Sequence, residues 1–216
     1  MNLLGCLVSM GLGIAVIAPL LQSNAVFVRK HTQVEKAWLV EHDAIRVLEL
    51  MARAIRMAGY LKIGSLAEYR QAQRMTQVDY IGLEHRSGWN HSDALWVKHE
   101  PADSAEGDCL GNRVEQGVHG KTQSRTKKGL RHQGFFVQKA VGDHAGSLMC
   151  TSLDRQGRLQ NTSLMNHIDS LQFKWVEHKT HQGRPPSAGR SGIQIVLKTT
   201  LVEREFSRFV ALRNAP

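Results

Sequence analysis

The sequence predicts an α+β protein with one long N-terminal helix, over about residues 1–60, and a small antiparallel β-sheet head within residues 61–216. Three observations support this fold class. Residues 3–21 carry no charge, and a helical repeat of apolar residues follows with no Gly or Pro between residues 22 and 58. Short alternating runs, separated by Gly-containing and charged loops, begin after residue 61.

The first part of the helix is long and apolar enough to cross a bilayer. Residues 3–21, LLGCLVSMGLGIAVIAPLL, reach roughly 28 Å as a helix, which is close to the hydrocarbon thickness of a membrane. The first charges are Arg29 and Lys30. Pro19 is expected to bend the helix inside this part, and Cys6 is expected to behave as a small buried hydrophobe. The sequence therefore predicts a transmembrane segment followed by a chain in water.

The second part of the helix is amphipathic. Apolar residues recur at alternating spacings of four and three, and only Glu41 interrupts them. This spacing predicts a stripe that packs along one side of the helix, formed by Val34, Trp38, Ile45, Leu48, Ala52, Ile55 and Gly59. The other face is charged, with Glu35, Lys36, Asp43, Arg46, Glu49, Arg53 and Arg56. Gly59 and Tyr60 predict the end of the helix, because Gly readily takes the left-handed cap.

Short runs of strand-forming residues predict the sheet. They cover residues 94–98, 135–138, 147–150 and 168–176, and the last of them alternates Leu171, Phe173 and Trp175 with polar residues. Near the C-terminus, residues 193–201 and 206–212 predict a hairpin with its turn near Glu203. Residues 61–80 are weakly patterned and are expected to be loop with a short helix.

Cys109 and Cys150 lie in the head without a CxxC or Cys/His zinc spacing. Two cysteines beyond a membrane anchor predict a disulfide in an oxidising compartment, and the alternative is two buried thiols. The enclosed loop of about 41 residues would stabilise the head by about 4 kcal/mol.

The formal charge of +9 is compatible with an anionic partner, or simply with a soluble surface facing the cell envelope. Residues 116–142 contain no acidic residue and six Lys or Arg. This loop could bind DNA phosphates without reading bases, through Lys121, Arg125, Lys127, Lys128 and Arg131. The alternative is an ordinary solvated loop.

Motifs for catalysis are weak. Gly120-Lys121-Thr122 ends like a phosphate-binding loop, but Glu115 stands where that motif requires Gly. His178 and His181 have no supporting carboxylate or cysteine at ligand spacing. The sequence also lacks a nucleophile elbow, so we expect no enzyme, no catalytic residues, no cofactor and no metal.

An ordered series of short motifs resembles type IV pilins, and the PilW-type minor pilins in particular. Residues 3–13 (LLGCLVSMGLG) resemble the start of a mature pilin, and residues 51–60 (MARAIRMAGY) resemble the end of the long helix. The motifs DAL, GDCLGN, GSLMC and VALRN follow in the order of that family, at residues 93–95, 107–112, 146–150 and 210–214.

The resemblance implies a pilin-like fold and a structural protein that primes or caps a filament. Its partners would be other major and minor pilins, bound through a helix seam formed by Leu3, Leu4, Leu7, Val8 and Leu12. It also implies a single pass through the inner membrane with a periplasmic head, and a place in the pilus once assembled. By charge alone, Arg29 and Lys30 would favour a cytoplasmic C-terminal side, whereas the cysteine pair favours the outside.

Two positions depart from the family pattern. Met1 stands where the mature chain usually begins with Phe, without the short basic leader, and Gly5 stands where the family has Glu. In pilins that carboxylate neutralises the N-terminal amine of a neighbouring subunit, so we expect weaker entry into a filament unless the true start lies upstream.

Two alternative functions share this architecture. One is a J-type pseudopilin of type II secretion, although the RMAGY and GDCLGN motifs favour the pilus. The other is a membrane-tethered DNA-binding component of DNA uptake, which would use the basic loop.

Overall fold

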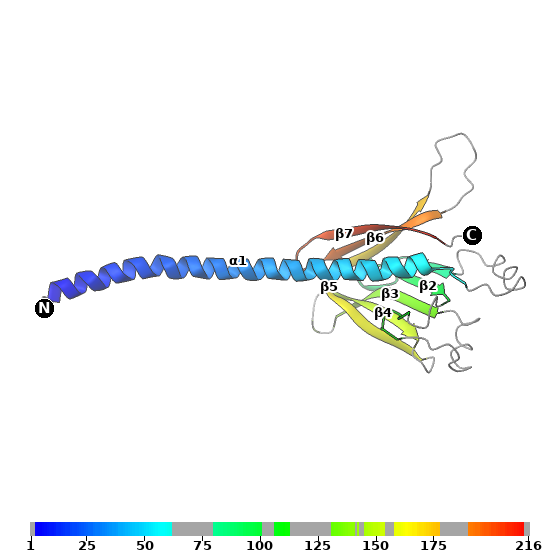
Figure 1. Cartoon of the computed structure of the whole chain (residues 1–216), viewed down its shortest axis with the longest axis horizontal. Coiled ribbons are helices and arrows are strands. Elements are labelled where there is room, and N and C mark those ends of the chain that lie inside the picture. Colours follow the sequence, from blue (N-terminus) through cyan, green and yellow to red (C-terminus); the bar gives the residue numbers. More distant parts are fainter. Residues whose placement is uncertain are drawn as a thin grey trace, which may run out of the picture. The chain divides into compact units, whose positions relative to one another are not determined.

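The computed structural model describes residues 3–61, 80–100, 106–112, 131–140, 142, 145–153, 158–177 and 190–213. The chain divides into two compact units, residues 1–42 and 43–216. Helix α1 (Leu3–Met57) contributes to both, and the second unit contains a seven-stranded sheet (Figure 1). The strands are β1 (Ile81–Glu84), β2 (Ala94–His99), β3 (Arg131–Lys139), β4 (Gly146–Leu153), β5 (Leu159–Glu177), β6 (Arg190–Thr199) and β7 (Glu205–Ala211). The α+β class, with one long N-terminal helix and an antiparallel sheet, is thereby confirmed.

Helix α1 continues through Pro19 and ends close to the predicted position. Gly59 adopts a left-handed φ of 74°, as expected for a residue just after a helix. The chain then joins the sheet, because Gly59 N donates to Lys98 O and Glu100 N donates to Tyr60 O. These bonds fix the end of the helix to the end of β2.

The buried face of α1 in the second unit is only partly the predicted stripe. Leu48, Ala52 and Ile55 are buried as expected. Ile45 is exposed, and so are Val34 and Trp38 in the first unit, so these three residues of the predicted stripe are not covered by the described part of the chain. The face that packs is instead completed by Ala44, Val47, Met51, Ala54 and Ala58. The curled sheet covers a broad arc of the helix, and this arc is centred away from the predicted stripe.

The sheet is a meander in which every strand pairs antiparallel with the next, in the order β1 to β7. Each predicted run lies within or overlaps a strand, and the predicted hairpin is formed by β6 and β7, with Glu203 at a φ of 46° in its turn. Leu201 belongs to this turn and not to a strand. Strand β1 and the first half of β5 were not predicted. Residues 62–79, expected to be loop and short helix, lie outside the described residues.

The sheet bends at strand β5. Its first half pairs with β4 and its second half with β6, with register shifts on both sides near Ile168. His167 has a φ of 60° at this point. Such an irregularity bends a strand and increases its twist, which lets the sheet curl around the helix (Figure 1).

The core of the second unit lies between α1 and the concave face of the sheet. Its largest fully buried side chains include Met51 and Ile55 from the helix. The sheet contributes Leu95, Phe135, Leu148, Ile168, Leu171, Phe173, Ile193, Ile195 and Leu197.

Candidate functional site

The uncharged segment of α1, residues 3–21, is apolar, and its described side chains are largely exposed. The helix is long enough and apolar enough to cross a bilayer, by length and composition. Leu7, Val8 and Leu12 of the predicted assembly seam are exposed, whereas the side chains of Leu3 and Leu4 lie outside the described residues. At Gly5, a Cβ atom would meet nothing within 4 Å. A side chain at position 5 would therefore face whatever surrounds the helix.

Exposed apolar residues continue beyond the uncharged segment. In the first unit they include Phe27, Val34 and Trp38, and the Trp38 side chain is 74% exposed. Large apolar side chains in water are unfavourable, at about 25 cal/mol for each Å² that a partner could cover. Their spacings of seven and four residues place them on one side of a helix, which suits the packing of a second helix.

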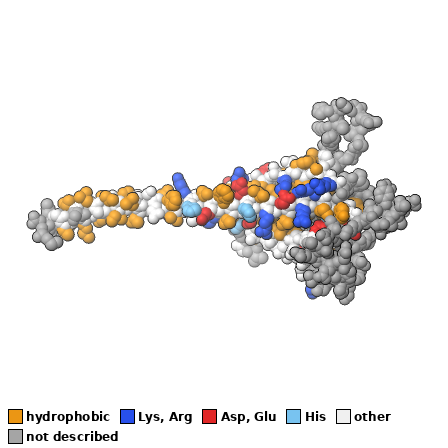
Figure 2. Space-filling model, in the orientation of Figure 1, with side chains coloured by type: hydrophobic (Ala, Val, Ile, Leu, Met, Phe, Trp, Pro, Cys, Tyr) orange, Lys and Arg blue, Asp and Glu red, His pale blue; other side chains and the backbone are white. Residues whose placement is uncertain are grey.

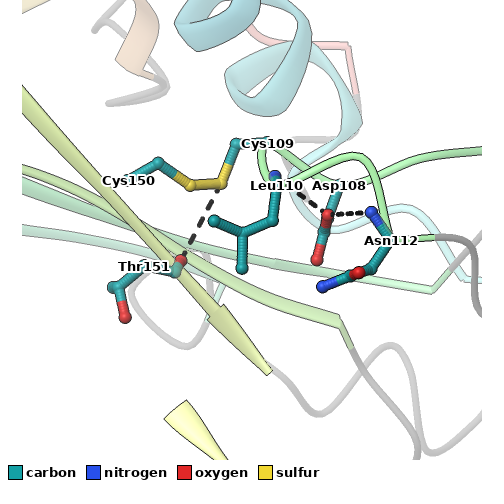
Figure 3. Close-up of a disulfide and its surroundings, with 6 residues drawn as sticks. All are labelled: Asp108, Cys109, Leu110, Asn112, Cys150 and Thr151. Carbon is teal, nitrogen blue, oxygen red and sulfur yellow. Dashed lines mark hydrogen bonds between the residues drawn. A yellow bond between two sulfur atoms is a disulfide. The ribbon is translucent and has the colours of Figure 1, made fainter. Parts of the chain in front are cut away.

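The disulfide joins Cys109 to Cys150, with 6.3 Å between their Cα atoms (Figure 3). Cys150 is fully buried on β4, and Cys109 Sγ lies 3.9 Å from Thr151 O. Residues 106–112 form a compact turn in which Asp108 Oδ1 accepts from Leu110 N and Asn112 N, at 2.9 and 2.8 Å. The disulfide thus holds this turn against the sheet.

A buried contact between His99 and Glu106 holds the same turn at a second point. His99 Nε2 on β2 lies 3.4 Å from Glu106 Oε1, and both side chains are almost fully buried. The segment around Cys109 is therefore fixed to β2 as well as to β4.

The candidate anion-binding loop cannot be placed. Lys121, Arg125, Lys127 and Lys128 lie outside the described residues. Arg131 begins β3, but its side chain is also outside the described set.

A different group of cations is visible on the second unit. Arg46, Arg53 and Arg56 lie on the exposed side of α1, and Arg208 of β7 reaches the same carboxylate as Arg56, that of Glu49. The helical positions were recognised from the sequence as a charged face. The contribution of Arg208 was missed, because it depends on the position of β7 beside the helix.

His132 on β3 is a described titratable side chain whose pKa is shifted. Its ring lies against Trp96, with the ring centroids 5.3 Å apart. Burial, and secondarily the nearby Lys98 ammonium, lower the pKa of His132 below its usual value of 6.5.

Within the described ranges, no group of three or more His, Cys, Asp or Glu side chains is arranged to hold a metal ion. A polar cleft of about 460 Å³ lies at the turn between β6 and β7. It is lined by Asp169, Lys198, Thr199, Thr200, Glu203, Arg204 and Glu205. Lys198 Nζ is 3.5 Å from Glu205 Oε2, so these two charges form a pair within the cleft.

Two surfaces are therefore candidates for function. One is the exposed apolar side of α1 in the first unit, and the other is the group of arginines on the second unit. Comparisons of the chain with protein-family models, with curated proteins and with solved structures find no match.

Proposed function

We propose that this chain is a minor subunit of a type IV pilus or a closely related filament. It would be anchored in the inner membrane by α1, with its head in the periplasm, and would prime or cap the filament as an assembly protein without catalytic activity. The observation that carries the proposal is the exposed apolar side of α1, which continues past the uncharged segment to Trp38.

An exposed apolar helix can be covered by a bilayer or by other helices. A bilayer accounts for the uncharged residues 3–21, but not for Val34 and Trp38, which follow the charges of Arg29 and Lys30. Apolar residues at these spacings are favourably covered by a second helix, as in coiled coils and helical bundles. Helices of other pilin subunits would supply this cover and continue the seam of Leu7, Val8 and Leu12.

The head supports an extracytoplasmic location. Disulfides persist in oxidising compartments, and the Cys109–Cys150 bond fixes a turn whose backbone is otherwise held by local hydrogen bonds and the His99–Glu106 pair. The sequence resemblance to PilW-type minor pilins points to the type IV pilus as the assembly that this chain joins. The arrangement of a helix packed on an antiparallel sheet is pilin-like and is compatible with this assignment.

The proposal is tested by asking whether the exposed side of the helix is needed to enter filaments. In the native host, Val34→Glu with Trp38→Glu should lower the amount of the chain in sheared filaments at least tenfold. The amount in the membrane fraction should stay the same. Because both residues are exposed, the fold of the head is retained. The matched control is Leu159→Glu, an exposed apolar residue on β5, which should enter filaments normally.

Two results would contradict the proposal. One is an unmodified chain that never appears in the filament fraction while its deletion leaves filament number unchanged. The other is equal incorporation of the double variant and the control.

A further inference from the structure

Four arginines gather on one exposed surface of the second unit. We call this surface the arginine strip and define it as Arg46, Arg53 and Arg56 of α1 with Arg208 of β7. Figure 2 shows Lys and Arg side chains side by side over the part of the helix that belongs to this unit. Arg46 and Arg53 are seven residues, or two turns, apart, so they lie on the same side of the helix and about 10 Å apart along its axis.

Glu49 pairs with two arginines of the strip, Arg56 and Arg208. Its Oε1 accepts from Arg56 Nη2 at 2.8 Å, and its Oε2 forms an ion pair with Arg208 Nη2. Arg56 Nε also donates to Ala52 O at 3.2 Å. One carboxylate therefore positions two guanidinium groups, and the strip keeps a positive charge because Arg46 and Arg53 add to it. Both of these side chains are exposed.

We propose that the arginine strip binds an acidic helix of a different subunit, one with Asp or Glu at seven-residue spacing beside an apolar seam. The inference rests on the proposed assembly function and names the chemistry of its partner. Ile45, which is 54% exposed, lies one turn before Glu49 on the same side of α1 and provides an apolar contact at the edge of the strip. A carboxylate from the partner could form a bidentate pair with each guanidinium group.

The spacing favours a helix over a nucleic acid. Carboxylates seven residues apart on a partner helix repeat every 10 Å or so, which matches Arg46 and Arg53. A second copy of this chain in the same parallel register would place arginine against arginine, so the strip selects a partner of another sequence.

The experiment measures how the full-length chain in detergent micelles binds two synthetic helical peptides. The peptides share one Leu/Ile seam over about three heptads. One peptide carries Glu at the flanking positions and the other carries Gln. At low salt, two exposed ion pairs should make the Glu peptide bind about five to ten times more tightly, and this preference should shrink as salt is raised.

Arg46→Gln with Arg53→Gln should abolish the preference and leave binding of the Gln peptide unchanged. The matched control, Lys139→Gln with Lys174→Gln, removes two exposed cations from β3 and β5 and should keep the preference. Arg46→Glu with Arg53→Glu should reverse it, so that a peptide with Lys at the flanking positions binds more tightly than the Glu peptide.

The inference is overturned if the two peptides bind equally, if neither binds, or if the control variant loses the preference to the same extent. It is also overturned if duplex DNA binds in an Arg46- and Arg53-dependent manner while the Glu peptide does not. Filament entry is measured separately through Val34 and Trp38, so failure of the charge preference is distinguishable from failure of the proposed function.

Discussion

At the scale of the residue, Trp96 shows how closely the outer face of the sheet is packed. The strand register places Gly82 on one side of Trp96 and Gly134 on the other. A Cβ at Gly134 would lie 2.3 Å from the indole ring and 2.6 Å from Thr151 Cγ2, whereas a Cβ at Gly82 would lie 3.6 Å from the nearest atom. The indole therefore fills the space above Gly134, whereas it only makes ordinary contact beside Gly82.

Gly134→Ala should consequently destabilise the head by about 2 kcal/mol, because a methyl group is forced into a filled site. Gly82→Ala is the matched control, since its methyl group makes ordinary contacts, and it should change the free energy of unfolding by less than about 0.5 kcal/mol. Urea unfolding followed by tryptophan fluorescence measures both. Equal effects of the two substitutions would show that the indole ring moves aside.

His132 gives the head a pH dependence of known sign. Its folded pKa lies below the unfolded value of 6.5, so the unfolded chain takes up this proton first as the pH falls. The contribution of His132 to stability is therefore complete above pH 6.5, is lost as the pH falls below it, and levels off below the folded pKa. Lys98→Gln should raise the pKa of His132, because it removes a positive charge but leaves burial unchanged.

NMR titration of the imidazole of His132 measures this pKa directly. Urea midpoints between about pH 8 and pH 5 measure the stability, and His132→Gln should flatten their fall. A pKa for His132 at or above 6.5 in the folded chain would contradict the prediction.

At the scale of the element, the connection between β1 and β2 is bonded to β5. Asp93 N donates to Leu171 O at 2.8 Å, and Leu171 N donates to Ser92 Oγ at 3.2 Å. The Asp93 carboxylate accepts from Phe173 N at 2.9 Å and from Arg86 N at 3.0 Å. These bonds connect segments that are not neighbours in the strand order, and they hold the sheet in its curled form.

Asp93→Ala should cost about 3 kcal/mol of unfolding free energy, because it leaves two backbone N–H groups without their acceptor. Asp169→Ala is the control, because its half-buried carboxylate accepts from the side-chain donor Asn90 Nδ2, and Asn90 also donates to Asp169 O, which the substitution keeps. Its cost should be about 0.5 kcal/mol or less. Comparable losses in denaturant midpoint for the two variants would refute the role given to Asp93.

The elements that the sequence predicted best are those whose signal is local. The end of α1 follows from Gly59, and β7 follows from a run of alternating residues after a turn. The first half of β5, LQNTSLMNH, has no such alternation, because little of it is buried. It is a strand because β4 pairs with it. The face of α1 that packs and the approach of Arg208 to Glu49 also depend on the curl of the sheet, which no local pattern encodes.

At the scale of the whole molecule, the two units share one helix but differ in how far their apolar residues are buried. The second unit buries its own apolar residues, whereas the described apolar side chains of the first unit are largely exposed. Gly5 lies where the pilin pattern has a carboxylate, in open space. Position 5 is therefore where the proposed assembly function can be strengthened by a single substitution.

Gly5→Glu should raise incorporation into filaments severalfold, because the new carboxylate can pair with the N-terminal amine of a neighbouring subunit in a low dielectric. Gly13→Glu, equally free of steric conflict, is the control and should lower membrane insertion without any gain, because its charge has no partner. Immunoblots of sheared filaments and membrane fractions measure both variants. If Gly5→Glu leaves incorporation unchanged, Gly5 does not limit assembly.

The burial of α1 beneath the sheet sets an order of events during synthesis. Val47, Met51 and Ile55 leave the ribosome early, whereas β6 and β7, whose buried faces complete the core, are the last strands made. About 135 residues separate Ile55 from the start of β6, and at 5–20 residues per second this delay is roughly 7 to 27 s. During this interval the apolar face of the helix lacks the cover of β6 and β7, which leaves the growing chain more prone to aggregation until the last two strands are made.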